Sequence, residues 1–378
     1  MSLKDKCAIV GLGYTVQGKV PGRSGTSFYV EASKNAIADA GLQVQDIDGI
    51  IIQPCPTDLR VSAFSLAQEL GLNLRYGADQ QLHGASSCAI IQHAAMAVDA
   101  GLCNYCLCAF ADTSRSGSPT TGIVYQMAMG TNAAYGMFGV AAGYAMIARR
   151  YMHEYGITSR QFGAVAVACR KHASLNPIAQ MREPITIEDH QNSRWIVEPL
   201  HLLDCCLVSD GGRALIVTSA ERARNLKQPP VYIMGMGQGH PLNDLLQREN
   251  LLDTGAVESG KTAFAMAGIT PADVDVCAIY DSFTFVVLMQ LEALGFCGKG
   301  EGGAFVEEGR IELGGELPTN TSGGLLSEVY IQGWVGPHEA VRQLRSDCGE
   351  RQVPGAEIAL VTASGGVMST HSTVILRR

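Results

Sequence analysis

Apolar runs that end in glycine alternate along the chain with segments whose apolar residues recur at helical spacing. Residues 7–13 (CAIVGLG) predict a buried strand, and residues 27–40 have the apolar spacing of a helix that ends at Gly41. A second strand is predicted at residues 47–52. The order strand, helix, strand predicts a parallel β–α–β unit and therefore an α/β fold.

Part of this pattern occurs twice in the chain. Residues 36–48 (AIADAGLQVQDID) match residues 263–275 (AFAMAGITPADVD), and an apolar strand follows each copy. Residues 231–237 resemble the opening strand, and residues 358–363 resemble residues 105–110. Internal similarity of this kind predicts two similar α/β halves.

A long excursion interrupts the first half. Its beginning is marked by residues 113–119 (TSRSGSP), which have turn chemistry and no apolar period. A linker with two prolines, residues 226–230 (LKQPP), separates the halves. The predicted division is an N-terminal half at 1–113 and 201–225, an inserted loop or lid domain at 114–200, and a C-terminal half at 226–378.

Composition narrows the class of protein. Hydrophobic residues make up 47% and charged residues 17% of 378 residues, with 43 glycines, which is typical of a tightly packed α/β protein. The net charge of −8 provides no basic surface for nucleic acid. No run of about 20 apolar residues predicts a membrane span, and the N-terminus has no secretory pattern, so we expect a cytoplasmic protein.

The 12 cysteines are spread through apolar runs of a large chain, so we expect reduced, buried thiols. Cys103 and Cys106 have CxxC spacing, but no second such pair or histidine pair completes a zinc site nearby. We expect no metal. The adjacent Cys205 and Cys206 are interpreted as packing residues.

Residues 320–333 (NTSGGLLSEVYIQG) form a glycine-rich loop that we interpret as a pocket wall. Gly323 and Gly324 remove Cβ atoms where a substrate would lie against the main chain, and Asn320 begins the loop. Tyr330 projects an acid or base from the second half of the loop. A second tyrosine, Tyr280, ends an apolar strand just before Asp281. We expect the two tyrosines to face one pocket.

The segment that begins with His83 and Gly84 leads into a predicted helix that runs to about Ala100. Gly84 provides either space for a substrate or a backbone N–H at the start of the helix. His83 is a candidate because it is the neighbour of Gly84. Candidate substrate-binding or oxyanion residues are therefore His83, Gly84, Asp281, Asn320, Gly323 and Gly324.

The duplicated halves, residues 171–177 (KHASLNP), residues 209–212 (SDGG) and the loop at 320–333 together resemble the thiolase superfamily. The resemblance covers nearly the whole chain and is strongest to sterol-carrier-type thiolases and lipid-transfer-protein-like enzymes. It implies a thiolase-like αβαβα five-layered duplicated fold with an inserted loop domain, and commonly a dimer.

The chain departs from the thiolase pattern at the residues that carry the sulfur chemistry. The family's nucleophilic cysteine falls on Gly84, and its two pocket histidines are replaced by Tyr280 and Tyr330. The second family cysteine would lie around residues 362–364, where the chain has none. Without a thiolate, the acyl-enzyme route is closed.

A retro-aldol cleavage of a β-hydroxyacyl-CoA needs no nucleophile, only a base, an acid and stabilisation of the thioester enolate. We assign Tyr330 as the proton-transfer residue and Tyr280 as its partner, although the roles are interchangeable. A phenolate at pH 7 would need its pKa lowered by about 3 units, against the effect of burial. A relay through Asp281, His338 or His371 would reduce that demand.

The resemblance extends to thiolase-like aldolases of steroid side-chain breakdown, which carry tyrosines in similar contexts. It implies an acyl-CoA substrate, no cofactor other than the CoA of that substrate, a homodimer, and a complex with a small OB-fold protein or hydratase subunit. Two alternatives stay open: an acyltransferase in which Cys88 serves as a displaced nucleophile, and a non-catalytic acyl-CoA-binding subunit. Packing within the helix is the competing interpretation of Cys88.

Overall fold

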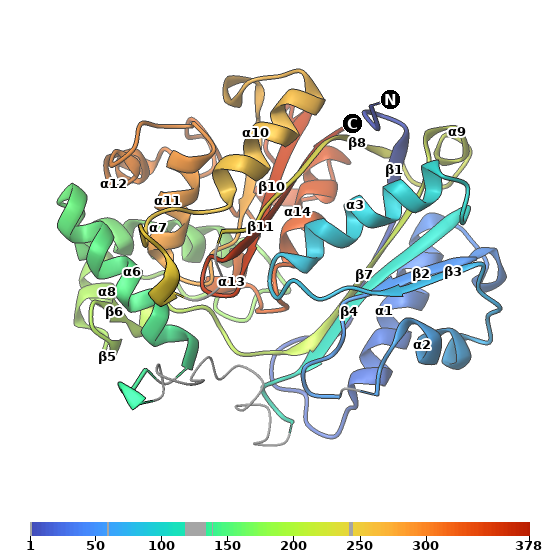
Figure 1. Cartoon of the computed structure of the whole chain (residues 1–378), viewed down its shortest axis with the longest axis horizontal. Helices are drawn as coiled ribbons and strands as arrows, with labels where there is room; N and C mark the ends of the chain where they lie inside the picture. Colours follow the sequence, from blue (N-terminus) through green and yellow to red (C-terminus); the bar gives the residue numbers. More distant parts are fainter. Residues whose placement is uncertain (1, 59, 118–133, 138, 242–244) are drawn as a thin grey trace.

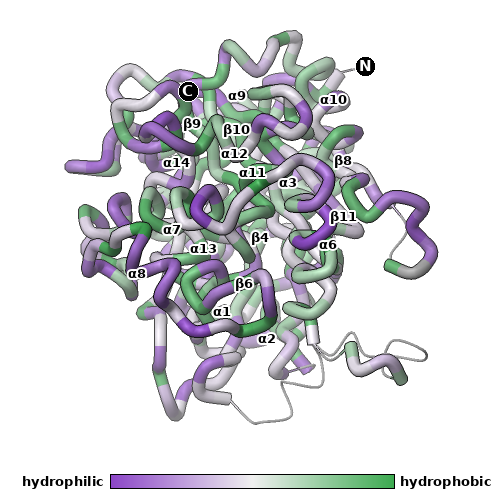
Figure 2. Tube along the Cα trace, turned by 90° about the vertical axis from the view of Figure 1, so that its left-hand side faces the viewer, coloured by the Kyte–Doolittle hydropathy of each residue, from purple (hydrophilic) through white to green (hydrophobic). Residues whose placement is uncertain are grey.

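The computed structural model describes residues 2–58, 60–117, 134–137, 139–241 and 245–378, and Figure 1 shows their arrangement. Within these residues, nine strands form one mixed sheet in the order β3-β2-β4-β7-β1-β8-β11-β10-β9. The predicted α/β class is confirmed. Hydrophobic positions lie mainly toward the middle of the molecule and hydrophilic positions toward its outer loops (Figure 2).

The N-terminal half supplies the strands from β3 to β1 in this order. β2 is parallel to β3 and β4, whereas β7 is antiparallel to β4 and to β1. β1 and β2 are therefore parallel, as predicted, but β4 and β7 lie between them. The elements of this half are β1 (Cys7–Tyr14), α1 (Gly25–Ala40), β2 (Gly49–Ile52), α2 (Ala63–Leu70), β3 (Tyr76–Asp79), α3 (Ser86–Asp99), β4 (Tyr105–Thr113), β7 (Asp210–Ser219) and α9 (Ala220–Ala223).

The C-terminal half continues the sheet. β11 is antiparallel to β8 and β10, β9 is parallel to β10, and a short pairing of β1 with β8 at Ala8–Tyr232 and Ile9–Val231 joins the halves. The elements of this half are β8 (Val231–Gly239), α10 (Ala256–Ala267), β9 (Val276–Ile279), α11 (Thr284–Ala293), α12 (Gly302–Val306), α13 (Gly324–Ser327), α14 (Val335–Leu344), β10 (Ile358–Gly365) and β11 (Thr370–Arg377).

Helices cover the sheet on its outer faces and also lie between the two halves. α1 and α2 pack on the outer face of the N-terminal half, and α10 packs outside β8 and β11 (Figure 1). α3 contacts β4 and β7 on one side and β10 and β11 on the other. His338 of α14 reaches the N-terminal half, with Nε2 at 3.1 Å from Gly13 O and 3.0 Å from Ala214 O. These contacts agree with the predicted αβαβα layers.

The two halves repeat the same close packing of a helix on a strand. A Cβ added at Gly11 would lie 2.3 Å from a backbone oxygen of α1, and one added at Gly235 would lie 2.3 Å from a backbone oxygen of α10. Each repeat ends in an aspartate, Asp48 or Asp275, that accepts two backbone N–H bonds near the start of β4 or β10. Because Gly11 and Gly235 have no Cβ, each of these strands can pack closely against its helix.

The excursion between β4 and β7 packs against the C-terminal half, because α7 contacts α11, α12 and α13. A buried bond of 2.7 Å between His190 Nε2 and Asp204 Oδ1 fixes its far end, and Thr284 Oγ1 donates to the same carboxylate at 2.5 Å. The division into three domains remains a prediction. The described elements of the excursion are α6 (Gly139–Tyr155), α7 (Ser159–Ser174), α8 (Ile187–Asn192), β5 (Trp195–Val197) and β6 (Leu200–His201).

Within the described ranges, no helix is both long and apolar enough to cross a membrane.

Candidate active site

Tyr280 and Tyr330 meet at the carboxyl end of β9, as predicted. Their hydroxyl oxygens lie 3.3 Å apart, within hydrogen-bonding distance. Tyr280 follows β9 directly, and its N–H donates to Thr362 O at 3.0 Å. Tyr330 follows α13, and its N–H donates to Ser209 Oγ at 3.3 Å. Two segments that are 50 residues apart in the sequence are thereby held with their phenols in contact.

Gly84 makes the position of Tyr280 possible. A Cβ added at Gly84 would lie 2.3 Å from the Tyr280 hydroxyl, 2.4 Å from its Cζ and 2.2 Å from Ser364 O. The ring of Tyr280 therefore occupies the space that a side chain at position 84 would need. This corrects the expectation that Gly84 leaves space for a substrate, because protein atoms fill that space. A role for its backbone N–H remains a prediction.

Two further glycines, Gly333 and Gly365, lie close to Tyr280 or to Gly84. Gly333 has a φ of 83°, and a Cβ there would lie 2.9 Å from Gly84 O and 3.0 Å from the ring of Tyr280. A Cβ at Gly365 would lie 2.8 Å from the backbone nitrogen of Gly84. The backbones at Gly84 and Gly333 thus pack against one tyrosine ring, and the backbone at Gly365 packs against that of Gly84.

Burial keeps both phenols protonated. It raises the pKa of Tyr280 well above the ordinary value near 10, and the neighbouring Tyr330 raises it further. Burial likewise raises the pKa of Tyr330. The raised pKa values therefore do not support a tyrosine that is ionised at neutral pH before the substrate binds. Two neutral hydroxyls in contact can still exchange protons, since each is both a donor and an acceptor.

Asp281 directly follows Tyr280 in the sequence, but its carboxylate accepts hydrogen bonds from backbone N–H groups of α13. Its Oδ1 accepts from Leu325 N–H at 2.9 Å, and its Oδ2 accepts from Leu326 N–H at 3.3 Å. Burial raises the pKa of this carboxyl to about 7 despite those bonds. Gly324, with a φ of 61°, is required here because a Cβ would lie 2.1 Å from Asp281 Oδ2.

Asn320 and Gly323 also make their contacts with protein. The Asn320 side-chain amide accepts from Ile279 N–H at 2.8 Å and donates to Ile279 O at 2.9 Å, which fastens the loop to the end of β9. A Cβ at Gly323 would lie 2.6 Å from that of Ala173 in α7. The missing Cβ atoms of Gly323 and Gly324 therefore admit Ala173 and Asp281, which corrects the expectation of space for substrate. Contacts of these backbones with a substrate remain a prediction.

The candidate histidines do not join the phenols by hydrogen bonds within the described residues. His83 is exposed and lies just before Gly84 with a φ of 51°. His338 is bound to backbone oxygens, and burial lowers its pKa to about 3. His371 is buried, its ring nitrogens have no hydrogen-bond partner in the described part of the chain, and burial lowers its pKa to about 3. The relay proposed through His338 or His371 is not supported.

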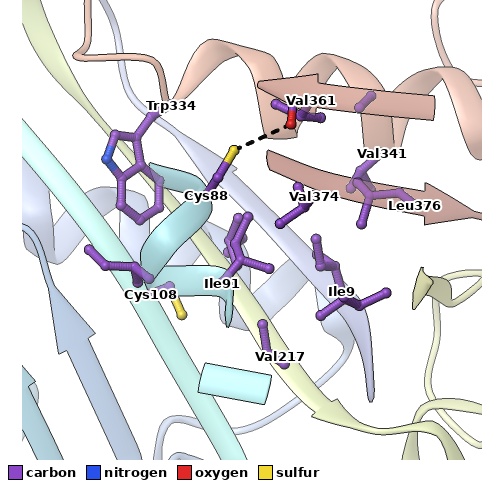
Figure 3. Close-up of a cluster of buried hydrophobic side chains, with 14 of the residues drawn as sticks. Ile9, Cys88, Ile91, Cys108, Val217, Trp334, Val341, Val361, Val374 and Leu376 are labelled. Atoms are coloured by element: carbon purple, nitrogen blue, oxygen red, sulfur yellow. Dashed lines mark hydrogen bonds between the residues drawn. The ribbon is translucent and has the colours of Figure 1, made fainter. Parts of the chain in front are cut away.

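Cys88 is a core residue. It is fully buried among Ile91, Val374 and Trp334, and its Sγ points to Val361 O at 3.8 Å (Figure 3). Burial raises the pKa of this thiol to about 12. A buried, protonated thiol lacks the activation that a nucleophile needs, so the displaced-nucleophile alternative is not supported.

Cys206 lies nearer to the phenols. A negative charge on Cys206, if this thiol were ionised, would raise the pKa of both Tyr280 and Tyr330. Burial raises the pKa of Cys206 itself far above its usual range, so it is a neutral thiol. No group of three or more metal-binding side chains occurs among the described residues.

Two buried polar groups that the sequence argument missed hold the loop with Tyr330. Arg213 of β7 forms an ion pair with Glu328, two residues before Tyr330, and both side chains are buried. Gln53 at the end of β2 accepts a bond of 2.9 Å from Trp334 Nε1 and donates to His83 O at 3.0 Å. A polar residue directly after a buried strand was the available signal for Gln53.

The fold brings two buried tyrosine hydroxyls into contact at one end of a mixed sheet with helices on its faces. A family model, Thiolase C-terminal domain-like, matches residues 237–378. The chain is 44% identical to 17-hydroxy-3-oxo-4-pregnene-20-carboxyl-CoA lyase of Mycobacterium tuberculosis, over 97% of this chain and 98% of the relative. It is also 44% identical to a steroid side-chain-cleaving aldolase of Thermomonospora curvata, over 97% and 96%.

Comparison with solved structures also shows a thiolase-type fold. An Ltp2–ChsH2(DUF35) aldolase superposes with a TM-score of 0.91 at 42% identity and covers 99% of this chain and 98% of that one. Human mitochondrial 3-ketoacyl-CoA thiolase, at 14% identity and a TM-score of 0.75, shares the fold. The chain belongs to the thiolase superfamily, in the branch of the steroid side-chain-cleaving aldolases. It is an enzyme of the lyase class.

Proposed function

We propose that the protein cleaves the carbon–carbon bond of a β-hydroxyacyl-CoA on a steroid side chain by a retro-aldol reaction. The products are a steroid ketone or aldehyde and a short acyl-CoA, and no cofactor is needed beyond the CoA of the substrate. The observation that carries this proposal is the contact of the Tyr280 and Tyr330 hydroxyls beside a glycine at position 84. The names of the relatives supply the steroid class.

Neutral phenols fit this reaction as a proton shuttle. The substrate hydroxyl proton passes to one tyrosine oxygen while that tyrosine passes its own proton to the other. In the same step the electrons of the breaking carbon–carbon bond move into the thioester enolate, and the second tyrosine gives its original proton to the enolate carbon as it accepts the new one. Both phenols end neutral, so the high pKa values that burial imposes do not oppose the cycle. No acyl-enzyme forms because no nucleophile takes part.

A complex with a small OB-fold protein is part of the proposal, together with a homodimer and a cytoplasmic location. The solved aldolase that superposes on 99% of this chain is a complex of Ltp2 with ChsH2(DUF35). The partner would complete the substrate site or stabilise the enzyme.

The test is purification of the chain with its co-purifying partner, followed by assay with a β-hydroxyacyl-CoA of a steroid. Release of a ketone or aldehyde and a short acyl-CoA in equal amounts is expected. Transfer of the acyl group to free CoA would instead support the acyltransferase alternative. Binding of the thioester without turnover, in the presence of the partner, would support a non-catalytic subunit.

A further inference from the structure

Gln53 connects the segment of Gly84 with the segment of Tyr330. Its side chain is fully buried, its Nε2 donates to His83 O at 3.0 Å and to Gln332 Oε1, and its Oε1 accepts from Trp334 Nε1 at 2.9 Å. The backbone of Gln53 is fixed as well, because its N–H donates to Ala109 O at 3.0 Å. A single amide, anchored at the end of β2, therefore bonds both loops of the site.

The two residues that accept hydrogen bonds from Gln53 Nε2 are held in an unfavourable backbone conformation. His83 has a φ of 51° and Gln332 has a φ of 40°, and neither is a glycine. Such conformations are unfavourable for residues other than glycine and persist where the surroundings fix them. His83 directly precedes Gly84, and Gln332 lies between Tyr330 and Gly333.

We propose that Gln53 is a positioning residue of this site, which sets the placement of Tyr330 against Tyr280 by holding His83 and Gln332. The inference rests on the proposed function, because it concerns proton transfer between the phenols. Gly333 shows how little freedom remains, since a Cβ there would lie 2.9 Å from Gly84 O. A displacement of about 1 Å in a reacting pair is enough to lower a rate about 100-fold.

Gln53→Met removes the hydrogen bonds and keeps the side-chain length. We expect kcat to fall at least about 10-fold while KM changes less than about 3-fold, because the phenols are displaced and distant contacts with the thioester persist. The matched control is Gln92→Met. Gln92 is a buried glutamine of α3 that donates to Gly237 O and Thr373 O, and not to the segments that carry Gly84 and Tyr330. The control should keep its kcat.

Trp334 reports the contact without any substrate. The chain has two tryptophans, and Trp195 is 51% exposed, so a Trp195→Phe background leaves Trp334 as the fluorophore. Loss of the bond from Trp334 Nε1 in Gln53→Met should shift its emission, whereas Gln92→Met should not. This readout stands even if the wild-type enzyme shows no aldolase turnover, so failure of the proposed function is seen separately.

Gln53→Glu supplies a second test. A protonated carboxyl still donates and accepts, so it partly replaces the amide, whereas a carboxylate cannot donate to His83 O or Gln332 Oε1. The activity of this variant should fall as the pH rises, relative to wild type measured at the same pH. The proposal is overturned if Gln53→Met keeps a kcat within about 3-fold of the Gln92→Met control. If Gln53→Met does not fold, a Gln53→Glu pH profile parallel to wild type overturns it.

Discussion

The hydroxyl of Tyr280 lies 2.3 Å from the point at which Gly84 would carry its Cβ. A side chain at position 84 and a tyrosine at position 280 therefore exclude one another. The resemblance to thiolases predicts the family's nucleophile at position 84, and on that prediction the phenol of Tyr280 occupies the space of that side chain. A larger residue at position 84 therefore requires a smaller or displaced residue at position 280.

Gly84→Ala should disable the enzyme by steric overlap alone. The added methyl group meets Tyr280 Oη and Ser364 O, and overpacking of this kind costs about 1–3 kcal/mol. We expect lower thermal stability by calorimetry and a displaced, inactive Tyr280. The control is Gly77→Ala, where the nearest atom would lie at 3.5 Å. Full activity in Gly84→Ala would contradict the packing described for Tyr280.

The same exclusion predicts non-additivity. Gly84→Cys alone should be destabilised by contact with the phenol, and Tyr280→His alone should leave a void beside Gly84. The double variant should be more stable than the sum of the two effects, because residues in contact are coupled. Urea denaturation of the four proteins measures the coupling. Additive losses would mean that the two positions do not share space.

Removal of either hydroxyl should stop proton transfer without affecting the fold. Tyr330→Phe is expected to lower kcat at least about 100-fold, the usual scale for a lost acid or base group, and Tyr280→Phe should behave similarly. Tyr232→Phe, at the start of β8 and away from the site, is the control. Circular dichroism checks the fold. Near-normal turnover in Tyr330→Phe would eliminate the phenol shuttle.

Much of the fold could be predicted because its determinants are local or repeated. The similar segments at 36–48 and 263–275 predict two similar halves. Gly41 and Gly268 end the corresponding helices with φ of 75° and 69°. The sheet order could not be predicted, since the insertion of β4 and β7 between β1 and β2 depends on pairing between distant segments.

Part of the candidate site could likewise be predicted from the sequence, and part could not. The contact of Tyr280 and Tyr330 could be anticipated because the resemblance to thiolases predicts both at positions of pocket histidines. The packing partners of Gly84, Gly323 and Gly324 could not, because a glycine in a sequence does not tell which atoms approach it. Gln53 was missed because its partners, His83 and Gln332, lie about 30 and 279 residues away.

Thiols should be dispensable. Cys88 is buried with a pKa raised to about 12, and burial also keeps Cys206 protonated. Cys88→Ala and Cys206→Ala should each keep kcat within about 3-fold of wild type, because neither thiol supplies the thiolate that covalent catalysis requires. Steady-state assay of the purified protein, with any partner that co-purifies, tests both. Loss of turnover in Cys88→Ala with an intact fold would restore the acyltransferase alternative.

Asp281 should make stability fall as the pH rises from about 4 to 7. Burial raises its pKa in the folded protein to about 7, whereas an unfolded aspartate ionises near 4, so the folded state holds the proton more tightly between these values. The stability from this group is complete below about pH 4 and is lost as the pH approaches 7. A difference of about three pKa units corresponds to about 4 kcal/mol.

Asp281→Asn removes this titration and keeps the volume of the side chain. The difference in unfolding free energy, wild type minus Asp281→Asn, should therefore decrease between pH 4 and pH 8, as measured by urea denaturation across that range. Asp253→Asn, in an exposed loop, is the control for removal of a carboxylate. A difference that stays constant with pH would mean that Asp281 is ionised throughout, with its charge stabilised by the N–H groups of Leu325 and Leu326.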